Sequence, residues 1–195
     1  MSKRVEPIKN KEDIKAMKEA MIEDEDWRAY LMFTVGINFG LRISDLLSLK
    51  FNDLIDKEGD FREVFTIDES KTNKRKNIKI NQSVKDAINM VIENTFLKRM
   101  ENYNRPMVWS GNNSRESMSR TTAHRIMKKY SKKVEIEDNI STHSLRKTHA
   151  FHIYKKTGDL ALVQKILNHS SPEMSLRYLG INSKQMNEAV NNLNL

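Results

Sequence analysis

The stretch Trp27 to Gly40, WRAYLMFTVGINFG, is apolar almost all the way round a helical wheel. A helix that is hydrophobic on every side is stable only where other parts of the protein surround it. The sequence therefore predicts a buried central helix that ends at Gly40. The longest apolar run, LMFTVGINFGL, contains Asn38 and is too short to cross a bilayer, so no membrane span is predicted.

The segments around this central helix show mainly helical spacing of apolar residues. A helix is predicted from about residue 10, and a short one in LRISDLLSLK. Residues 51–82 differ, because FREVFTI is rich in β-branched and aromatic residues, KNIKI alternates, and the polar turn DESKTNKR separates them. This pattern predicts an antiparallel hairpin or a three-stranded sheet. Further helices are predicted over 83–100, 119–133, 142–154, 159–167 and 172–178, with PMVWS as a short strand or extended segment. The predicted fold class is mainly α with a small antiparallel β-sheet (α+β).

Charge and cysteine content narrow the possible functions. The 195 residues suit one ordinary domain. Lys plus Arg outnumber Asp plus Glu by 34 to 26, for a net charge of +8. This balance favours a polyanionic partner, of which nucleic acid is the commonest, although a generally basic surface also fits it. The lack of cysteine excludes disulfides, thiolate zinc sites and cysteine nucleophiles. No secretory signal is visible at the N-terminus, which predicts a cytoplasmic protein.

The stretch His143 to Tyr178 gathers side chains that could hold an anion and attack it. His143 and Arg146 are three residues apart and would share a helix face. His169 lies in the polar turn NHSSP, and Tyr178 follows nine residues later. Attack by a tyrosine on a phosphodiester needs guanidinium groups for the non-bridging oxygens and a proton donor for the leaving oxygen. This stretch supplies Arg146 for the non-bridging oxygens. A second arginine and the proton donor for the leaving oxygen must come from elsewhere.

Arg42 and Lys71 are the candidates for these two roles. Arg42 follows Gly40 at a break between helices, where a basic residue either lines a site or extends to solvent from a helix end. Asp45, one turn further, either pairs with Arg42 or supports another site residue. Lys71 lies at the tip of the predicted hairpin. The cations beside it are interpreted as a solvated turn or as nonspecific contacts with DNA: Lys74, Arg75 and Lys76.

Four segments together resemble the catalytic domain of the tyrosine recombinase (phage integrase) family, from about residue 10 to 182. They are GLRISDLLSL, SKTNKRKNIKI, HSLR (which matches the family's H-x-L-R box) and LNHSSPEMSLRYLG, with the family's nine-residue interval between histidine and tyrosine. The resemblance implies the fold of these DNA breaking-rejoining enzymes. It also implies a catalytic set, which is Arg42, Lys71, His143, Arg146, His169 and Tyr178.

The resemblance further implies a site-specific recombinase or integrase that cleaves and rejoins DNA strands through a 3′-phosphotyrosyl link at Tyr178. Arg42 and Arg146 would hold the scissile phosphate, and Lys71 would protonate the leaving oxygen. His143 would support the proton transfers, and the histidine nine residues before the tyrosine would bind a phosphate oxygen. No ATP, metal or other cofactor is expected. The expected partner is double-stranded DNA, bound by a homotetramer that forms on the DNA from subunits that can be monomers in solution.

The expected organisation is a flexible lead-in over 1–10, the catalytic domain over 11–182 and a tail helix over 183–195. The tail either folds back on its own domain or docks on a neighbouring subunit. Most family members carry a separate helical domain ahead of the catalytic one, and none is predicted here. Contacts with the DNA backbone are expected from the hairpin turn and the basic helix 119–133, through Lys74, Arg75, Lys76, Arg120, Arg125 and Lys128.

Two other functions are considered beside the recombinase. His149 and His152 have a spacing that could share a metal, with His143 nearby, but no cysteine or well-placed acidic ligand accompanies them. A metal site is therefore disfavoured, and His149, His152 and His124 are interpreted as structural or surface residues. The second alternative is a non-cleaving DNA-binding module that regulates or competes with a full-length recombinase. Such a module would not require Tyr178 together with both arginines.

Overall fold

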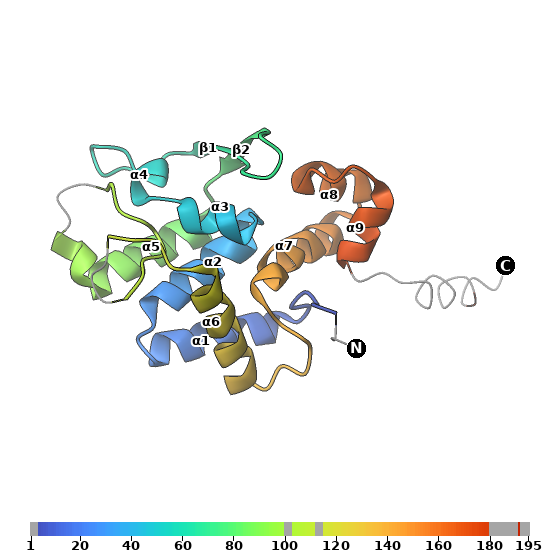
Figure 1. The fold of residues 1–195 in the computed structure, drawn as a ribbon, viewed down its shortest axis with the longest axis horizontal. Helices are drawn as coiled ribbons and strands as arrows, with labels where there is room; N and C mark the ends of the chain where they lie inside the picture. The colour runs from blue at the N-terminus through green and yellow to red at the C-terminus, as the bar shows by residue number, and fades with distance from the viewer. Residues whose placement is uncertain (1–3, 100–102, 112–114, 180–190, 192–195) are drawn as a thin grey trace.

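The computed structural model describes residues 4–99, 103–111, 115–179 and 191. They form a helical body with a two-stranded sheet along one edge and further helices beside it (Figure 1). In chain order the elements are α1 (Lys11–Glu23), α2 (Trp27–Phe39), α3 (Ile43–Ser48), α4 (Phe51–Leu54), β1 (Val64–Asp68), β2 (Arg75–Lys79), α5 (Gln82–Asn94), the 3₁₀ helix η1 (Phe96–Arg99), α6 (Arg120–Lys133), α7 (Thr142–Thr157), α8 (Leu160–Leu167) and α9 (Pro172–Leu179). The predicted fold class is confirmed.

Helix α2 lies in the main hydrophobic core, as its apolar sequence predicts. Most of its residues are buried, and it packs against α1, α5 and α7. At its start the side chain of Asp26 accepts a hydrogen bond from the backbone N–H of Ala29. Gly40 ends the helix with φ at 60°, in the left-handed region that favours glycine. Because Gly40 turns the chain here, Arg42 leaves the core two residues later, at the N-cap position of α3.

The hairpin contains two strands, which decides between the two sheets that the sequence allowed. Strands β1 and β2 pair antiparallel, with Ile67 opposite Lys76. Phe65 and Ile78 are buried and attach the hairpin to the main core. The segment PMVWS forms no strand and makes only isolated bridges, through Pro106 and Trp109. The turn of the hairpin lies near α8 (Figure 1).

Helices α7, α8 and α9 carry the second half of the predicted site. The hydroxyl of Ser141 accepts a hydrogen bond from the N–H of His143, and that of Ser144 accepts one from the N–H of Ser141. This capping box starts α7 directly before the HSLR motif. Helices α8 and α9 pack on α7 through a small cluster separate from the main core, made of Ala150, Val163, Leu167 and Leu179. The predicted site residues thus come from regions with two different hydrophobic clusters.

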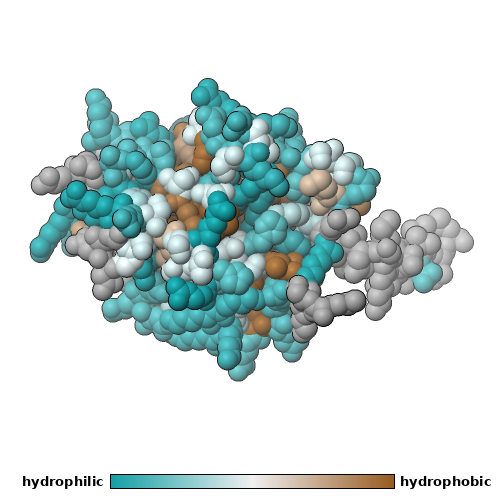
Figure 2. Space-filling view, in the orientation of Figure 1, coloured by the Kyte–Doolittle hydropathy of each residue, from teal (hydrophilic) through white to brown (hydrophobic). Residues whose placement is uncertain are grey.

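The predicted helix boundaries differ from the structure in a few places. Helix α5 ends at Asn94 and is followed by the separate turn η1, whereas α7 continues to Thr157. The tail helix predicted over 183–195 lies outside the described residues, apart from residue 191. None of the described helices is long and apolar enough to span a bilayer. The face drawn in Figure 2 is mostly hydrophilic, with small hydrophobic areas.

Candidate active site

Arg146 is the largest fully buried side chain in the described part of the chain, with 2% of its surface exposed. Its Nη1 donates to the carbonyl oxygen of Gly40 and its Nη2 to that of Leu167, both at 2.6 Å. Because these carbonyls lie at the ends of α2 and α8, the guanidinium ties the main body to the C-terminal helices. A guanidinium has five donors, so Arg146 has further N–H groups for an anion.

Glu69 joins the two predicted arginines. Its carboxylate is fully buried, with Oε2 at 2.9 Å from Nη1 of Arg42 and Oε1 at 3.7 Å from Nη1 of Arg146. Oε2 also accepts hydrogen bonds from Nδ2 of Asn168 at 3.0 Å and Oγ1 of Thr72 at 2.9 Å. Burial alone would raise the pKa of Glu69, but these hydrogen bonds and the charge of Arg42 lower it to about 2. The ionised carboxylate therefore holds the two guanidinium groups close together.

Asp45 is almost fully buried and anchors the turn of the hairpin. Its Oδ1 accepts a hydrogen bond from the backbone N–H of Ser70 at 3.2 Å and from the hydroxyl of Ser70 at 2.5 Å. Of the two roles that the sequence allowed for Asp45, the structure shows support of a neighbouring segment. Lys71 lies between Ser70 and Thr72, which are both anchored, while its own side chain is exposed. The backbone of Lys71 is thus held at the margin of the arginine pair.

Tyr178 lies between the two predicted histidines. Its ring meets that of His143 edge-on with centroids 5.1 Å apart, and that of His169 with centroids 4.8 Å apart. The tyrosine hydroxyl lies 2.5 Å from Nε2 of His143. His169 follows Asn168, which ends α8 in the left-handed conformation, and its Nδ1 lies 3.1 Å from the hydroxyl of Ser175. Three aromatic rings from α7, the end of α8, and α9 therefore form one contiguous group.

Burial and positive neighbours change the proton affinities of these rings. Burial raises the pKa of Tyr178, and the charges of Arg146 and Arg42 oppose this rise. Burial, assisted by the nearby cations, lowers the pKa of His143 and lowers that of His169 to about 4. Both imidazoles are therefore neutral at pH 7, and a neutral imidazole can accept a proton. The tyrosine hydroxyl and His143 form a donor–acceptor pair.

The residues predicted to contact the DNA backbone fall into two groups. Five are exposed, namely Lys74, Arg75, Arg120, Arg125 and Lys128. The sixth, Lys76, has a buried amine nitrogen, so a contact at the surface does not suit it. Two other lysines of α6, Lys129 and Lys133, form ion pairs with Asp24 at 2.7 and 2.6 Å and hold α6 against the end of α1. DNA contact through the five exposed residues stays a prediction.

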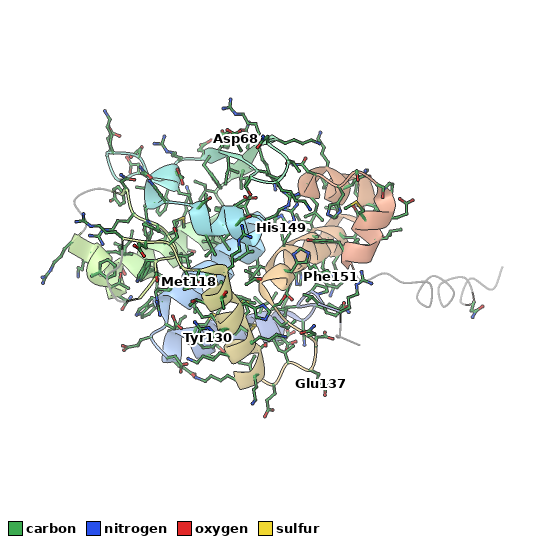
Figure 3. All side chains as sticks on the ribbon, viewed as in Figure 1. Asp68, Met118, Tyr130, Glu137, His149 and Phe151 are labelled. Atoms are coloured by element: carbon green, nitrogen blue, oxygen red, sulfur yellow. The ribbon has the colours of Figure 1, made fainter. Side chains whose placement is uncertain are left out.

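The remaining histidines lie against backbone or solvent. Nδ1 of His149 is 3.1 Å from the carbonyl oxygen of Ile37, and Nε2 of His152 is 3.1 Å from that of Ile8. His149 lies on the side of α7 that faces α2 and α3 (Figure 3). His124 is exposed. Within the described residues, no three potential metal ligands come together.

The structure brings five of the six predicted catalytic residues into one region, and it places Lys71 at the margin. The positive charges of Arg42 and Arg146 lower the pKa of both Tyr178 and His169, so the arginines and the two rings are neighbours. Sequence reasoning missed Glu69 and gave Lys76 a surface role. The local signal was weak, because an acidic residue in the basic turn DESKTNKR looks like any other turn residue. What distinguishes Glu69 is its contact with residues distant in the chain.

Comparisons with known proteins identify the family. Residues 9–185 match the model of the Phage integrase family. The chain is 36% identical over 177 residues to the "Probable integrase/recombinase YoeC" of Bacillus subtilis (strain 168), which covers 91% of this chain and 90% of that protein.

Solved structures agree in fold. A crystal structure of XerA recombinase has a TM-score of 0.70 at 21% identity, covering 100% of this chain and 67% of that one. A lambda integrase tetramer bound to a Holliday junction has a TM-score of 0.66 at 19% identity, covering 91% of this chain and 49% of that one. The family match spans most of the residues, including the whole of the candidate site. The chain therefore belongs to the phage integrase family and is an enzyme of the tyrosine recombinase type.

Proposed function

We propose that this chain cleaves and rejoins DNA strands in site-specific recombination, with Tyr178 as the nucleophile of a transesterification. The observation that carries the proposal is the position of the Tyr178 hydroxyl. It lies 2.5 Å from the neutral imidazole of His143, in a region where the charges of Arg146 and Arg42 act on it. Membership of the phage integrase family supports recombination as the outcome.

Arg42 and Arg146 would bind the non-bridging oxygens of the scissile phosphate. A pentavalent transition state places additional negative charge on these oxygens. Donors that are fixed beforehand stabilise that charge without reorganising during the reaction. Arg146 meets this requirement because two backbone carbonyls hold its guanidinium, and Arg42 because Glu69 does. Burial strengthens the attraction, since the effective dielectric constant around the pair is lower than that of water.

The proposed proton transfers follow the hydrogen bonds around the tyrosine. Oη of Tyr178 attacks the phosphorus and forms a P–Oη bond, its proton passes to Nε2 of His143, and the bond from phosphorus to the 5′ oxygen breaks. Lys71 gives a proton to the leaving oxygen, which becomes a 5′-hydroxyl. His169 binds a phosphate oxygen from the other side of the tyrosine ring. The phosphotyrosyl link conserves the energy of the phosphodiester, so a 5′-hydroxyl can reverse the reaction without ATP or a metal ion.

The proposed partner is double-stranded DNA. The exposed cations of the hairpin turn and of α6 would contact its phosphates, with a binding constant that falls as salt rises. The lambda integrase tetramer on a Holliday junction, which shares this fold, supports a homo-oligomer on DNA for this chain as well. A cytoplasmic location, with access to DNA, is part of the proposal.

A covalent adduct is the product that tests this function. Nicked duplexes with a randomised sequence around the nick would be incubated with the wild-type chain, because loss of a short leaving strand traps the cleaved state. Adducts that survive denaturant would be isolated and sequenced, which also identifies the target site. We expect adducts from the wild type and none from Tyr178→Phe, with DNA affinity unchanged. Tyr154→Phe is the matched control, because it removes a phenol hydroxyl from the same hydrophobic cluster and leaves the site intact.

The other outcomes separate the alternatives. DNA binding by the wild type without any adduct across the library would contradict cleavage and support the non-cleaving module. An adduct that disappears on addition of a chelator would contradict the metal-free mechanism. Adducts that persist in Tyr178→Phe would show that another residue is the nucleophile.

A further inference from the structure

Lys76 differs from every other cation of the hairpin. It lies in β2, opposite Ile67, and its amine nitrogen is buried. Lys74, Arg75 and Lys79, which surround it in the chain, are all exposed. An ammonium group is expensive to remove from water, so a buried lysine normally has a partner that compensates for the loss. In the described structure Lys76 Nζ has neither a hydrogen bond nor an ion pair.

Charged and titratable groups from three other parts of the fold either shift the pKa of this amine through their charge or have their own pKa shifted by it. They are Arg42 and Asp45 at the start of α3, Glu69 in the hairpin turn, and Arg146 and His149 in α7. Lys76 is therefore close to both arginines that are proposed to bind the scissile phosphate. It approaches them from the sheet side, whereas Tyr178 belongs to the helical side.

Unpartnered polar atoms concentrate at this place. Six buried side-chain nitrogen or oxygen atoms of the described residues lack a hydrogen-bond partner, and four of them belong to this group: Arg42 Nη1, Asp45 Oδ2, Glu69 Oε1 and Lys76 Nζ. Native proteins leave few such atoms, and a cluster of them is typical of a functional site. Nη1 of Arg42 forms its ion pair with Glu69 Oε2 at 2.9 Å without the alignment of a hydrogen bond.

A purely structural role would have a recognisable contact. If Lys76 only balanced the buried carboxylates, its amine would pair with Asp45 or Glu69, each of which has an oxygen without a hydrogen bond. No such ion pair occurs among the described residues, in which salt bridges extend to 4.0 Å. The amine of Lys76 thus lies among the buried carboxylates of Asp45 and Glu69 without forming a hydrogen bond or an ion pair to either of them.

We propose that Lys76 is a third phosphate-binding cation of the active site, which donates to the scissile phosphate beside Arg42 and Arg146. This inference rests on the proposed DNA cleavage and adds a residue to it. The role is distinct from that of Lys71, which supplies the proton to the leaving oxygen. Lys76 contributes positive charge and a hydrogen bond to the phosphate in the ground state and, more strongly, in the transition state.

The amine is poised to respond to the phosphate. Burial and the charge of Arg146 lower the pKa of Lys76 to about 8, although Glu69 opposes this. The ammonium form is therefore present below pH 8 and is lost as the pH rises through that value in the free protein. An arriving phosphate adds negative charge and raises this pKa again, so the bound state keeps the proton to a higher pH.

The kinetic test compares three lysine variants on the trapping duplex recovered above. We expect Lys76→Met to slow single-turnover adduct formation about 10²-fold, with DNA Kd changed by less than about threefold, because other contacts supply most of the affinity. Lys76→Arg should recover part of the rate, since it restores a cation. Lys79→Met, an exposed lysine on the same strand, is the matched control and should react at the wild-type rate.

A substrate with sulfur in place of the bridging 5′ oxygen separates the two lysine roles. A thiolate leaves without a proton, so this substrate should restore the rate of Lys71→Met and leave Lys76→Met slow. Restoration of Lys76→Met would overturn the charge role in favour of proton donation. A Lys76→Met variant that reacts at the wild-type rate would overturn the proposal altogether.

A second measurement does not depend on cleavage. Lysine labelled with carbon-13 at Cε would be titrated by NMR in the Tyr178→Phe variant, with the Lys76 resonance assigned from Lys76→Arg. We expect a midpoint near 8 in the free protein, and an upward displacement on adding the intact target duplex. A midpoint that DNA does not displace would contradict phosphate binding by Lys76. Failure of the wild type to form an adduct would instead contradict the proposed DNA cleavage. The titration does not require cleavage, so the two failures can be told apart.

Discussion

The arginine pair and the tyrosine belong to regions with different support. Arg42 and Arg146 are joined through the buried Glu69 and lie against the main core, which includes α2 and the hairpin. Tyr178 lies in α9, which packs with α8 against one side of α7 through four buried residues (Figure 1). Both regions include α7, and the guanidinium of Arg146 is hydrogen-bonded to carbonyls on both sides.

This difference follows from what each region has to hold. Burying guanidinium groups costs desolvation energy, which is offset only where fixed partners surround them. The nucleophile proposed above, Tyr178, would become bonded to DNA and later be released, which favours a segment that can move. Segments with few buried contacts open at lower free energy than the core. The comparison therefore predicts a preformed arginine region beside a more mobile tyrosine region.

The largest expected effect is on the arginine region. Arg146→Lys should slow adduct formation about 10³-fold, because an ammonium cannot reproduce the planar set of donors that contacts two carbonyls and would contact the phosphate. Single-turnover trapping measures the rate, and a binding assay should show nearly unchanged affinity. Arg125→Lys, at an exposed position of α6, is the control and should have little effect. A loss of less than tenfold in Arg146→Lys would mean that its guanidinium does not bind the phosphate.

The next effect tests whether the two hydrophobic clusters open separately. Leu167→Ala removes a fully buried side chain of the small cluster and should destabilise α8 and α9 by about 3 kcal/mol. Hydrogen exchange should then accelerate in α8 and α9 while α2 stays protected. Leu46→Ala, in the main core, should instead lower the stability of the whole domain. If both variants accelerated hydrogen exchange equally in all helices, the two clusters would unfold as one cooperative unit. The distinction between the arginine region and the tyrosine region would then be wrong.

A smaller effect concerns the carboxylate that joins the arginines. The pKa of Glu69 is lowered to about 2 in the folded protein, so its stabilisation is complete above pH 4.5 and is lost as the pH falls toward 2. The loss should reach about 3 kcal/mol. Urea unfolding at several pH values measures it. Glu69→Gln should be less stable at neutral pH and should show a shallower decline in acid. An unchanged pH dependence in Glu69→Gln would contradict the depressed pKa.

The smallest effect concerns the exposed cations outside both regions. Arg120→Ala should weaken DNA binding only a few-fold and reduce the slope of log affinity against log salt by about 0.9. The adduct rate at saturating DNA should not change, because this side chain is not part of the reacting group. A fluorescence titration at several salt concentrations is sufficient. A reduced rate at saturation would place Arg120 closer to the chemistry than the exposed face of α6 suggests.

Local patterns predicted most of the fold. The all-round apolar α2 and the strands of the hairpin each depend on residues within one or two turns. The break between α5 and η1 was not predicted, and PMVWS forms isolated bridges instead of the short strand that its sequence allowed. At both places packing against distant segments competes with local preference, and a local pattern does not contain that information.

The sequence by itself determined the chemical inventory of the site, because side-chain type and spacing within a helix or turn are local properties. The six predicted residues include the tyrosine, both histidines and both arginines that the structure brings into one region. Tertiary structure alone decided how charge is distributed around them: that Glu69 joins Arg42 to Arg146, that Asp45 anchors the hairpin, and that the amine nitrogen of Lys76 is buried. Burial of a charged group depends on contacts with elements distant in the chain, and those contacts exist only after the hairpin, α3 and α7 have packed together.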